Sequence, residues 1–197
     1  MVRAWTHVLT LSKLKPQEVV TVLTSDGTHP QTLRTALIAA TNLGARVNRL
    51  DLPPVNAEHA HSRDSLAYLG TTPLTGNRAA MAALKESDLV LDLMTLLFSP
   101  EQMEILESGT KILLAVEPPE VLVRLLPSLE DKATVGEATA LLKAAKEMHV
   151  TSRAGTDLRL PIGEFPTVQE YGFVDEPGRW DHWPSGFGFT FPNEGQA

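Results

Sequence analysis

Residues 19–52, VVTVLTSDGTHPQTLRTALIAATNLGARVNRLDL, decide the fold of this chain. The run at 19–24 is rich in β-branched residues and predicts a buried strand. Residues 30–43 carry Ala and Leu at helical spacing, open on a proline that suits a first helical turn, and are followed by Gly44, which suits the position just past a helix end. Residues 46–52 predict a second strand. Together they form a βαβ unit with a right-handed crossover.

The alternation of strand and helix patterns continues along the chain. Further strands are expected at 89–93, 111–116 and 149–152, and helices at 5–14, 76–86, from Ser99-Pro100-Glu101 onward, 117–126 and 130–148. Repeated alternation of this kind is typical of a mostly parallel sheet with helices on both faces. We therefore predict an N-terminal α/β domain over residues 1–152.

The pattern changes after residue 152, where no helix is indicated. Leu158, Leu160 and Ile162 alternate with other residues, and three phenylalanines alternate with Gly and Thr at 187–191. Period-two alternation predicts strands, and antiparallel pairing is the simplest arrangement for them. We expect residues 153–197 to begin a β-rich domain. Because the sequence stops six residues after the last Phe, we also expect that this domain is truncated and that the missing part carries much of the function.

Composition limits the classes of function. The 197 residues have a formal net charge of −7 and no basic run, which argues against a nucleic-acid partner because phosphate contacts need clustered Lys and Arg. Cysteine is absent, so disulfides and thiolate metal sites are excluded. No apolar run is long enough to span a membrane, and the first residues do not resemble a signal peptide. These features fit a cytoplasmic protein.

Known nucleotide and hydrolase motifs are missing. There is no phosphate-binding loop, no G-x-G-x-x-G and no G-x-S-x-G, so the α/β pattern alone does not indicate a nucleotide. His59 and His61 have the spacing of two metal ligands on one side of a strand, but two ligands without a third make a poor site.

Asp181-His182-Trp183 is the best local candidate for chemistry. A histidine beside bulky aromatic rings can be partly desolvated and can serve as an acid, a base or a hydrogen-bond donor. The alternative is a structural histidine bonded to backbone within an aromatic cluster. Glu170 follows a strand-like run and either points inward or lies exposed, as glutamates more often do.

The loop at 96–99 lies just beyond the carboxyl end of an expected parallel strand. Ligands of open α/β sheets bind outside those ends. Its two Leu and one Phe would line a pocket or meet a partner if they were exposed there. The alternative is that they belong to the core beneath the next helix.

Three stretches resemble a known family: DLMTLLFSPEQ at 92–102, KILLAVEPPEVLVRLLPS at 111–128 and EYGFVDEPGRWDHWPSGFGFTFPNEG at 170–195. They are similar to the 2,5-dihydroxypyridine 5,6-dioxygenases, and the likeness extends through nearly the whole chain. The resemblance implies a mononuclear non-heme Fe(II) enzyme of nicotinate degradation. Such an enzyme opens the ring of 2,5-dihydroxypyridine, a small aromatic N-heterocycle, with O₂ to give N-formylmaleamate. The resemblance also implies a ring-like homo-oligomer.

The resemblance carries roles to particular residues. It implies that Glu170 and His182 are catalytic and that Leu97, Phe98 and Ser99 bind the substrate as part of the pocket wall. The family pattern has a histidine, the expected proton donor, at the position of Phe98. The family's iron ligands, two His and one Asp, lie in its carboxyl-terminal part, so we expect no metal ligand in this chain and Fe(II) bound beyond residue 197.

Two alternatives stay open. A more distant resemblance is to aminopeptidase T-like metallopeptidases, but there the string P-T-G-E supplies a metal-binding Glu, and here Phe187 stands in its place. The chain would also fit a non-catalytic binding or assembly module, with the aromatic segment at its end as an oligomer interface.

Overall fold

The structure is a computed structural model that describes residues 1–53, 72–96 and 98–193. It forms two compact units. The first comprises residues 1–127 and 172–184, and the second comprises residues 128–171 and 185–197. Among the described helices, none combines the length and hydrophobicity that crossing a bilayer would require.

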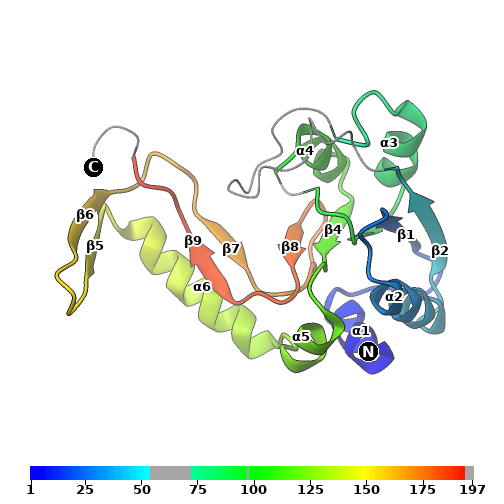
Figure 1. Cartoon of the computed structure of the whole chain (residues 1–197), viewed down its shortest axis with the longest axis horizontal. Helices are drawn as coiled ribbons and strands as arrows, with labels where there is room; N and C mark the ends of the chain where they lie inside the picture. The colour runs from blue at the N-terminus through cyan, green and yellow to red at the C-terminus, as the bar shows by residue number, and fades with distance from the viewer. Residues whose placement is uncertain (54–71, 97, 194–197) are drawn as a thin grey trace. The chain divides into compact units, whose positions relative to one another are not determined.

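A five-stranded parallel sheet forms the centre of the first unit (Figure 1). Its order is β2-β1-β3-β4-β8, and all four neighbouring pairs are parallel. The strands are β1 (Val19–Thr24), β2 (Arg46–Asp51), β3 (Leu89–Asp92), β4 (Lys111–Leu114) and β8 (Trp180–His182). The predicted parallel sheet is therefore confirmed, and its strand order reverses between β1 and β3.

Helices cover both faces of this sheet. They are α1 (Val2–Leu11), α2 (Pro30–Asn42), α3 (Arg78–Lys85), α4 (Pro100–Glu107) and α5 (Pro119–Arg124). Figure 1 shows α1 and α2 on one side of the strands and α3 and α4 on the other. Helix α2 ends as the sequence predicts, because Gly44 adopts the left-handed φ of 83° that only glycine takes without strain.

The side chains that face α3 and α4 can be read from the strand register. Val90, Ile112 and Trp180 lie side by side on adjacent strands, and all three belong to or pack against the core formed with α3 and α4. Asp92 and His182 lie two residues further along their strands. Because side chains of residues i and i+2 point to the same face, both point to the α3–α4 face, at the carboxyl ends of the strands.

The second unit is built around α6 (Leu129–Ala144), which packs against β7 (Val168–Glu170) and β9 (Phe187–Phe189). These two strands are antiparallel. A Cβ on Gly188 would lie 2.6 Å from the Thr139 hydroxyl oxygen, so only glycine allows the helix this close to the strand. β5 (Glu147–Thr151) and β6 (Asp157–Pro161) form a separate antiparallel pair.

Two features differ from the sequence-based expectation. The strand expected at 149–152 does not join the parallel sheet, since among the described strands β5 pairs only with β6. The place of a fifth parallel strand is taken by β8, which comes from a segment where no parallel strand was predicted. β8 has only three residues and lacks a β-branched run, so its local sequence gives no strand signal.

The compact units also differ from the predicted ranges 1–152 and 153–197. The first unit ends at residue 127 and regains residues 172–184, because β8 completes its sheet. The long helix α6 belongs to the second unit, because it packs on β7 and β9.

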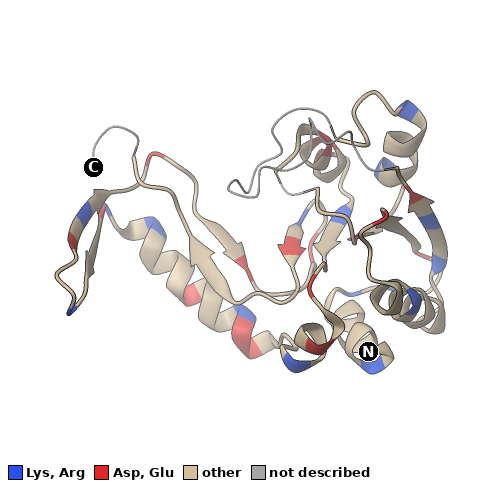
Figure 2. Cartoon of the chain, in the orientation of Figure 1, with Lys and Arg blue, Asp and Glu red and all other residues tan. Residues whose placement is uncertain are grey.

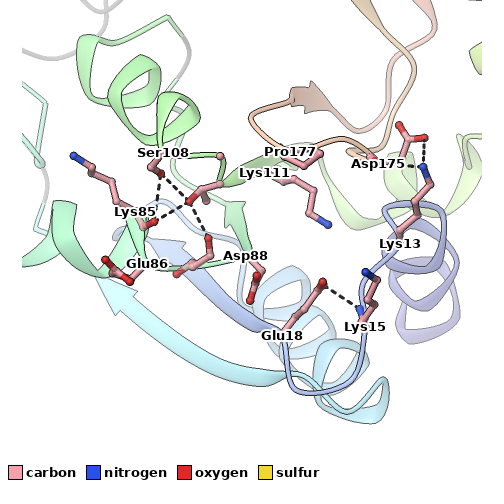
Figure 3. A pocket seen from close by; sticks show the side chains of 13 residues that line it. Lys13, Lys15, Glu18, Lys85, Glu86, Asp88, Ser108, Lys111, Asp175 and Pro177 are labelled. Atoms are coloured by element: carbon pink, nitrogen blue, oxygen red, sulfur yellow. Dashed lines mark hydrogen bonds and ion pairs between the residues drawn. The ribbon is translucent and has the colours of Figure 1, made fainter.

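A cavity of about 410 Å³ lies at the amino ends of the parallel strands, and Figure 3 shows the residues that line it. Lys111, the first residue of β4, is 9% exposed, and its Nζ donates to the carbonyl oxygen of Ser12 at 3.0 Å. Ser12 caps the carboxyl end of α1, where a cation is favourable. Burial lowers the pKa of Lys111, while Glu18 and Asp88 partly offset that effect.

This burial predicts a pH dependence. In the unfolded chain the Lys111 amine keeps its ordinary pKa near 10.5, whereas in the folded protein its pKa is lower. Between the two values the unfolded state binds more protons, so the free energy of unfolding rises with pH. Lys111→Met should lack this rise in urea denaturation from neutral pH upward. Lys85→Met, at an exposed lysine paired with Glu104, should keep it. Equal slopes in Lys111→Met and the unmodified chain would contradict the prediction.

Candidate functional site

Polar side chains gather at the carboxyl ends of β3, β4 and β8 in the first unit. Asp92 ends β3, His182 ends β8, and both are in register with Leu114 of the strand between them. Glu117 follows β4 in the turn before α5. This is the edge at which open α/β sheets bind ligands.

His182 and Glu117 form a directly bonded pair. The His182 Nε2 and the Glu117 Oε1 are 2.8 Å apart, and the two side chains are 22% and 26% exposed. The other carboxylate oxygen, Oε2, is buried and has no hydrogen-bond partner among the described residues. A carboxylate in this position fixes the orientation of an imidazole and stabilises its protonated form.

Strand β8 holds His182 firmly in place. The Asp181 Oδ1 accepts the N–H of Gly172 at 2.8 Å and the N–H of His182 at 2.8 Å. Its Oδ2 lies 2.5 Å from the Nη2 of Arg179. On the other side, the indole Nε1 of the buried Trp183 donates to the carbonyl oxygen of Leu125 at 2.9 Å. His182 is thus flanked by two anchored residues.

Asp92 organises the loop after β3. Its fully buried carboxylate accepts the backbone N–H groups of Met94, Thr95 and Leu96, at 3.0, 2.8 and 2.7 Å. Burial raises the pKa of Asp92, and these three hydrogen bonds and the nearby His182 partly lower it again. The carboxylate therefore serves to shape the loop that follows.

Phe98 occupies a strained position in that loop. Its φ is 58°, a left-handed value that is costly for a bulky residue, and Thr95 has a φ of 73°. The N–H of Phe98 donates to the Gln102 Oε1 at 2.7 Å. The residue is 37% exposed, and its ring lies 5.9 Å, centroid to centroid, from that of Trp180. An aromatic surface thus lies beside the strand that carries His182.

The sequence left open whether the loop at 96–99 lines a pocket or belongs to the core, and the structure shows some of its residues exposed and others buried. Leu96 is buried in the core with α3 and α4, whereas Phe98 is exposed. Ser99 is fully buried, and its hydroxyl accepts the N–H of Gln102 at 3.1 Å as the N-cap of α4, which confirms the predicted cap. Leu97, His59 and His61 lie outside the described residues.

Glu170 lies in the second unit. It is 4% exposed, ends β7 and is in register with Phe187 of β9. The sequence left open whether the Glu170 side chain points inward or lies exposed, and the structure shows it buried. For His182, the structure shows a side chain bonded to a carboxylate rather than to backbone alone.

Asp92 and Glu117 were not singled out from the sequence. Both stand at the carboxyl end of an expected parallel strand, which is the same signal that selected the loop at 96–99. The first could have been found in LVLDL at 89–93 and the second in KILLAVE at 111–117.

The part of the chain that the structure describes contains no group of three His, Cys, Asp or Glu side chains suited to a metal ion. Asp92, Glu117 and His182 do not form such a group, because Asp92 is fully engaged with backbone N–H groups. The described residues therefore do not fit an iron centre of two His and one carboxylate.

Comparison with known proteins gives one consistent result. The family model of NicX, 2,5-dihydroxypyridine 5,6-dioxygenase, matches residues 1–197. A 2,5-dihydroxypyridine 5,6-dioxygenase of Pseudomonas putida KT2440 is 54% identical over 191 residues, which is 97% of this chain and 55% of that protein. A solved structure of the dioxygenase from Pseudomonas putida KT2440 has a TM-score of 0.91 and 53% identity, and the match covers 98% of this chain and 56% of that one.

The chain thus spans about half the length of the relatives that it matches. The family match covers all of its residues, including the sheet edge that carries His182 and Glu117. The chain belongs to the NicX family of 2,5-dihydroxypyridine 5,6-dioxygenases.

Proposed function

We propose that the protein containing this chain opens the ring of 2,5-dihydroxypyridine with O₂, placing both oxygen atoms in N-formylmaleamate, as a step of nicotinate degradation. The observation that carries the proposal is the bonded pair of His182 and Glu117 at the carboxyl edge of the sheet. The family match and the 54% identity to a dioxygenase support the reaction.

In this proposal the present residues bind and orient the substrate. His182 hydrogen-bonds a hydroxyl group of the substrate ring and exchanges a proton with it, while Glu117 keeps the imidazole oriented. Phe98 and Leu97 form the apolar wall against the heterocycle, and Ser99, buried as the N-cap of α4, supports this wall. Glu170 acts as a base or an orienting carboxylate.

Iron supplies the activation of O₂ in the proposed reaction. Since the described residues do not bring three suitable ligands together, we propose that Fe(II) is held by the rest of the protein. We further propose a cytoplasmic homo-oligomer without a nucleic-acid partner. Figure 2 shows basic and acidic residues interspersed on the described elements, in keeping with the formal net charge of −7.

Oxygen uptake tests the proposal. Full-length protein loaded anaerobically with Fe(II) should consume O₂ in step with 2,5-dihydroxypyridine, and ¹⁸O₂ should label the product at two positions. Release of amino acids from peptides with Zn²⁺ or Co²⁺, without O₂ uptake, would instead indicate a metallopeptidase. If the protein showed neither activity, the proposal would be overturned and a non-catalytic binding module would be indicated.

Phe98 offers a direct test of the departure from the family pattern. Phe98→His places an imidazole where the family resemblance implies a proton donor, and a histidine tolerates positive φ better than phenylalanine does. Because a positioned acid contributes about 10²-fold or more, we expect kcat to rise by at least about tenfold. Phe98→Leu, which adds no acid, serves as the control. A kcat in Phe98→His no higher than in Phe98→Leu would show that this position takes no part in proton transfer.

A further inference from the structure

A second cavity opens where the strand order reverses between β1 and β3. Its volume is about 180 Å³. The residues that line it are Ser25, Gly27, Thr28, His29, Thr32, Leu93, Met94, Thr95, Ala115 and Val116. None of these ten is Asp, Glu, Lys or Arg, so no carboxylate among them would repel an anion. Helix α2 begins at this cavity.

Thr32 lines this cavity and has hydrogen-bond donors that find no acceptor among the described residues. It is 2% exposed, and its hydroxyl oxygen is buried with no hydrogen-bond partner among the described residues. Its backbone N–H, in the first turn of α2, has no acceptor among those residues either. Unpaired buried donors are uncommon, because a donor that is removed from water without gaining an acceptor destabilises the folded state.

The neighbouring donors of the first turn are already satisfied. The Gln31 N–H donates to the Nδ1 of His29 at 3.2 Å, and the Leu33 N–H donates to the His29 carbonyl oxygen at 3.1 Å. Thr28 accepts the N–H of Ser25 at 3.0 Å and donates to the carbonyl oxygen of Leu93 at 2.9 Å. Among the residues that line this cavity, Thr32 is thus the one whose buried side-chain oxygen has no hydrogen-bond partner in the described part of the chain.

His29 adds a further donor at the rim. Because its Nδ1 accepts a hydrogen bond, the proton of the neutral imidazole is on Nε2. The first turn of a thirteen-residue helix also carries a partial positive charge from the aligned peptide dipoles. The partner that suits several N–H and O–H donors at such a position is a small group with more than one acceptor oxygen.

We propose that this cavity binds a small oxyanion, a carboxylate or a phosphate, through the N–H and O–H of Thr32 and the Nε2–H of His29. The cavity is several times larger than the roughly 30 Å³ of a water molecule, so it has room for such a group. The two residues that would bind the oxyanion, Thr32 and His29, have no role in the proposed ring cleavage, although the cavity also borders the loops after β3 and β4.

Amide chemical shifts test this site. The ¹⁵N-labelled chain is titrated with inorganic phosphate, acetate and chloride at constant ionic strength. Phosphate or acetate should shift the amide resonances of Thr32 and Leu33 saturably, and the anion with the lower Kd identifies the class of oxyanion. Chloride should cause no saturable shift. Thr32→Val removes one charge-assisted hydrogen bond and should weaken that binding by about 10-fold or more. His29→Asn keeps an N-cap oxygen and should weaken it less.

Thr35→Val is the matched control, because the Thr35 hydroxyl donates to the Gln31 carbonyl oxygen on the same helix. It should bind the oxyanion like the unmodified chain. Without any oxyanion, Thr32→Val should melt no lower than the unmodified chain, since it removes an unsatisfied hydroxyl. If valine prevents folding, Thr32→Ala replaces it. The absence of saturable shifts, a response that chloride reproduces, or unchanged affinity in the Thr32 variant would each overturn the proposal.

Discussion

His182→Gln is expected to lower kcat for opening of 2,5-dihydroxypyridine by about 10²–10⁴-fold in the full-length protein, because a positioned acid–base group contributes that much. Glutamine can still hydrogen-bond but cannot take up a proton. The Nε2 of His182 is 2.8 Å from the Glu117 carboxylate, and its strand is anchored by Asp181, so the backbone should not move. Steady-state O₂ uptake measures the effect.

A histidine of similar local chemistry provides the control. The Nε2 of His149 lies 2.7 Å from the Oδ1 of Asp157, on the exposed β5–β6 pair. His149→Gln should leave kcat unchanged. Glu117→Gln keeps a hydrogen bond to His182 but removes the charge, and it should lower kcat less than His182→Gln does. Wild-type turnover in His182→Gln would remove this residue from the mechanism.

Asp92→Ala is expected to lower the free energy of unfolding by about 2–4 kcal/mol, which is large against the 5–15 kcal/mol that stabilises a typical domain. The substitution removes the acceptor of three backbone N–H groups in the loop that leads to Phe98. Part of the loss is offset, because alanine does not carry the cost of burying a carboxylate. Urea denaturation at neutral pH measures the difference.

Two other substitutions make this result specific. Asp92→Asn keeps the oxygen that accepts from Met94 and Thr95 but turns an N–H₂ group toward the N–H of Leu96, so its effect should be intermediate. Asp51→Ala removes an exposed carboxylate paired with Arg49 and should lower the free energy of unfolding much less than Asp92→Ala does. If Asp92→Ala cost no more than Asp51→Ala, the three hydrogen bonds would not be what orders this loop.

The fold was predictable wherever local patterns coincide with the final structure. The β-branched run at 19–24 is β1, and the Ser-Pro-Glu sequence at 99–101 starts α4 with the expected cap. These elements depend on residues close together in the chain. The α/β class followed from their alternation, and the family resemblance followed from the strings around Phe98 and His182.

The site was predictable only in part. His182 was identified, but its partner was not, because Glu117 lies sixty-five residues away and no local pattern connects the two. The antiparallel pairing of β5 with β6 was missed because a short strand has the same composition in either kind of sheet. The positive φ of Phe98 could not be predicted either, since phenylalanine has no preference for that conformation.

The sequence by itself determined the βαβ class, the helices and strands that have a strong local pattern, and His182 as a candidate chemical group, since periodicity and capping act over a few residues. Only the tertiary structure decided that β8 adds to β4, and with it that His182 stands beside Glu117 and in the same row as Asp92. A three-residue strand has too little intrinsic preference to choose its neighbour. Its place is set by the buried Asp181 and Trp183 and by the hydrogen bonds that the edge of β4 leaves open.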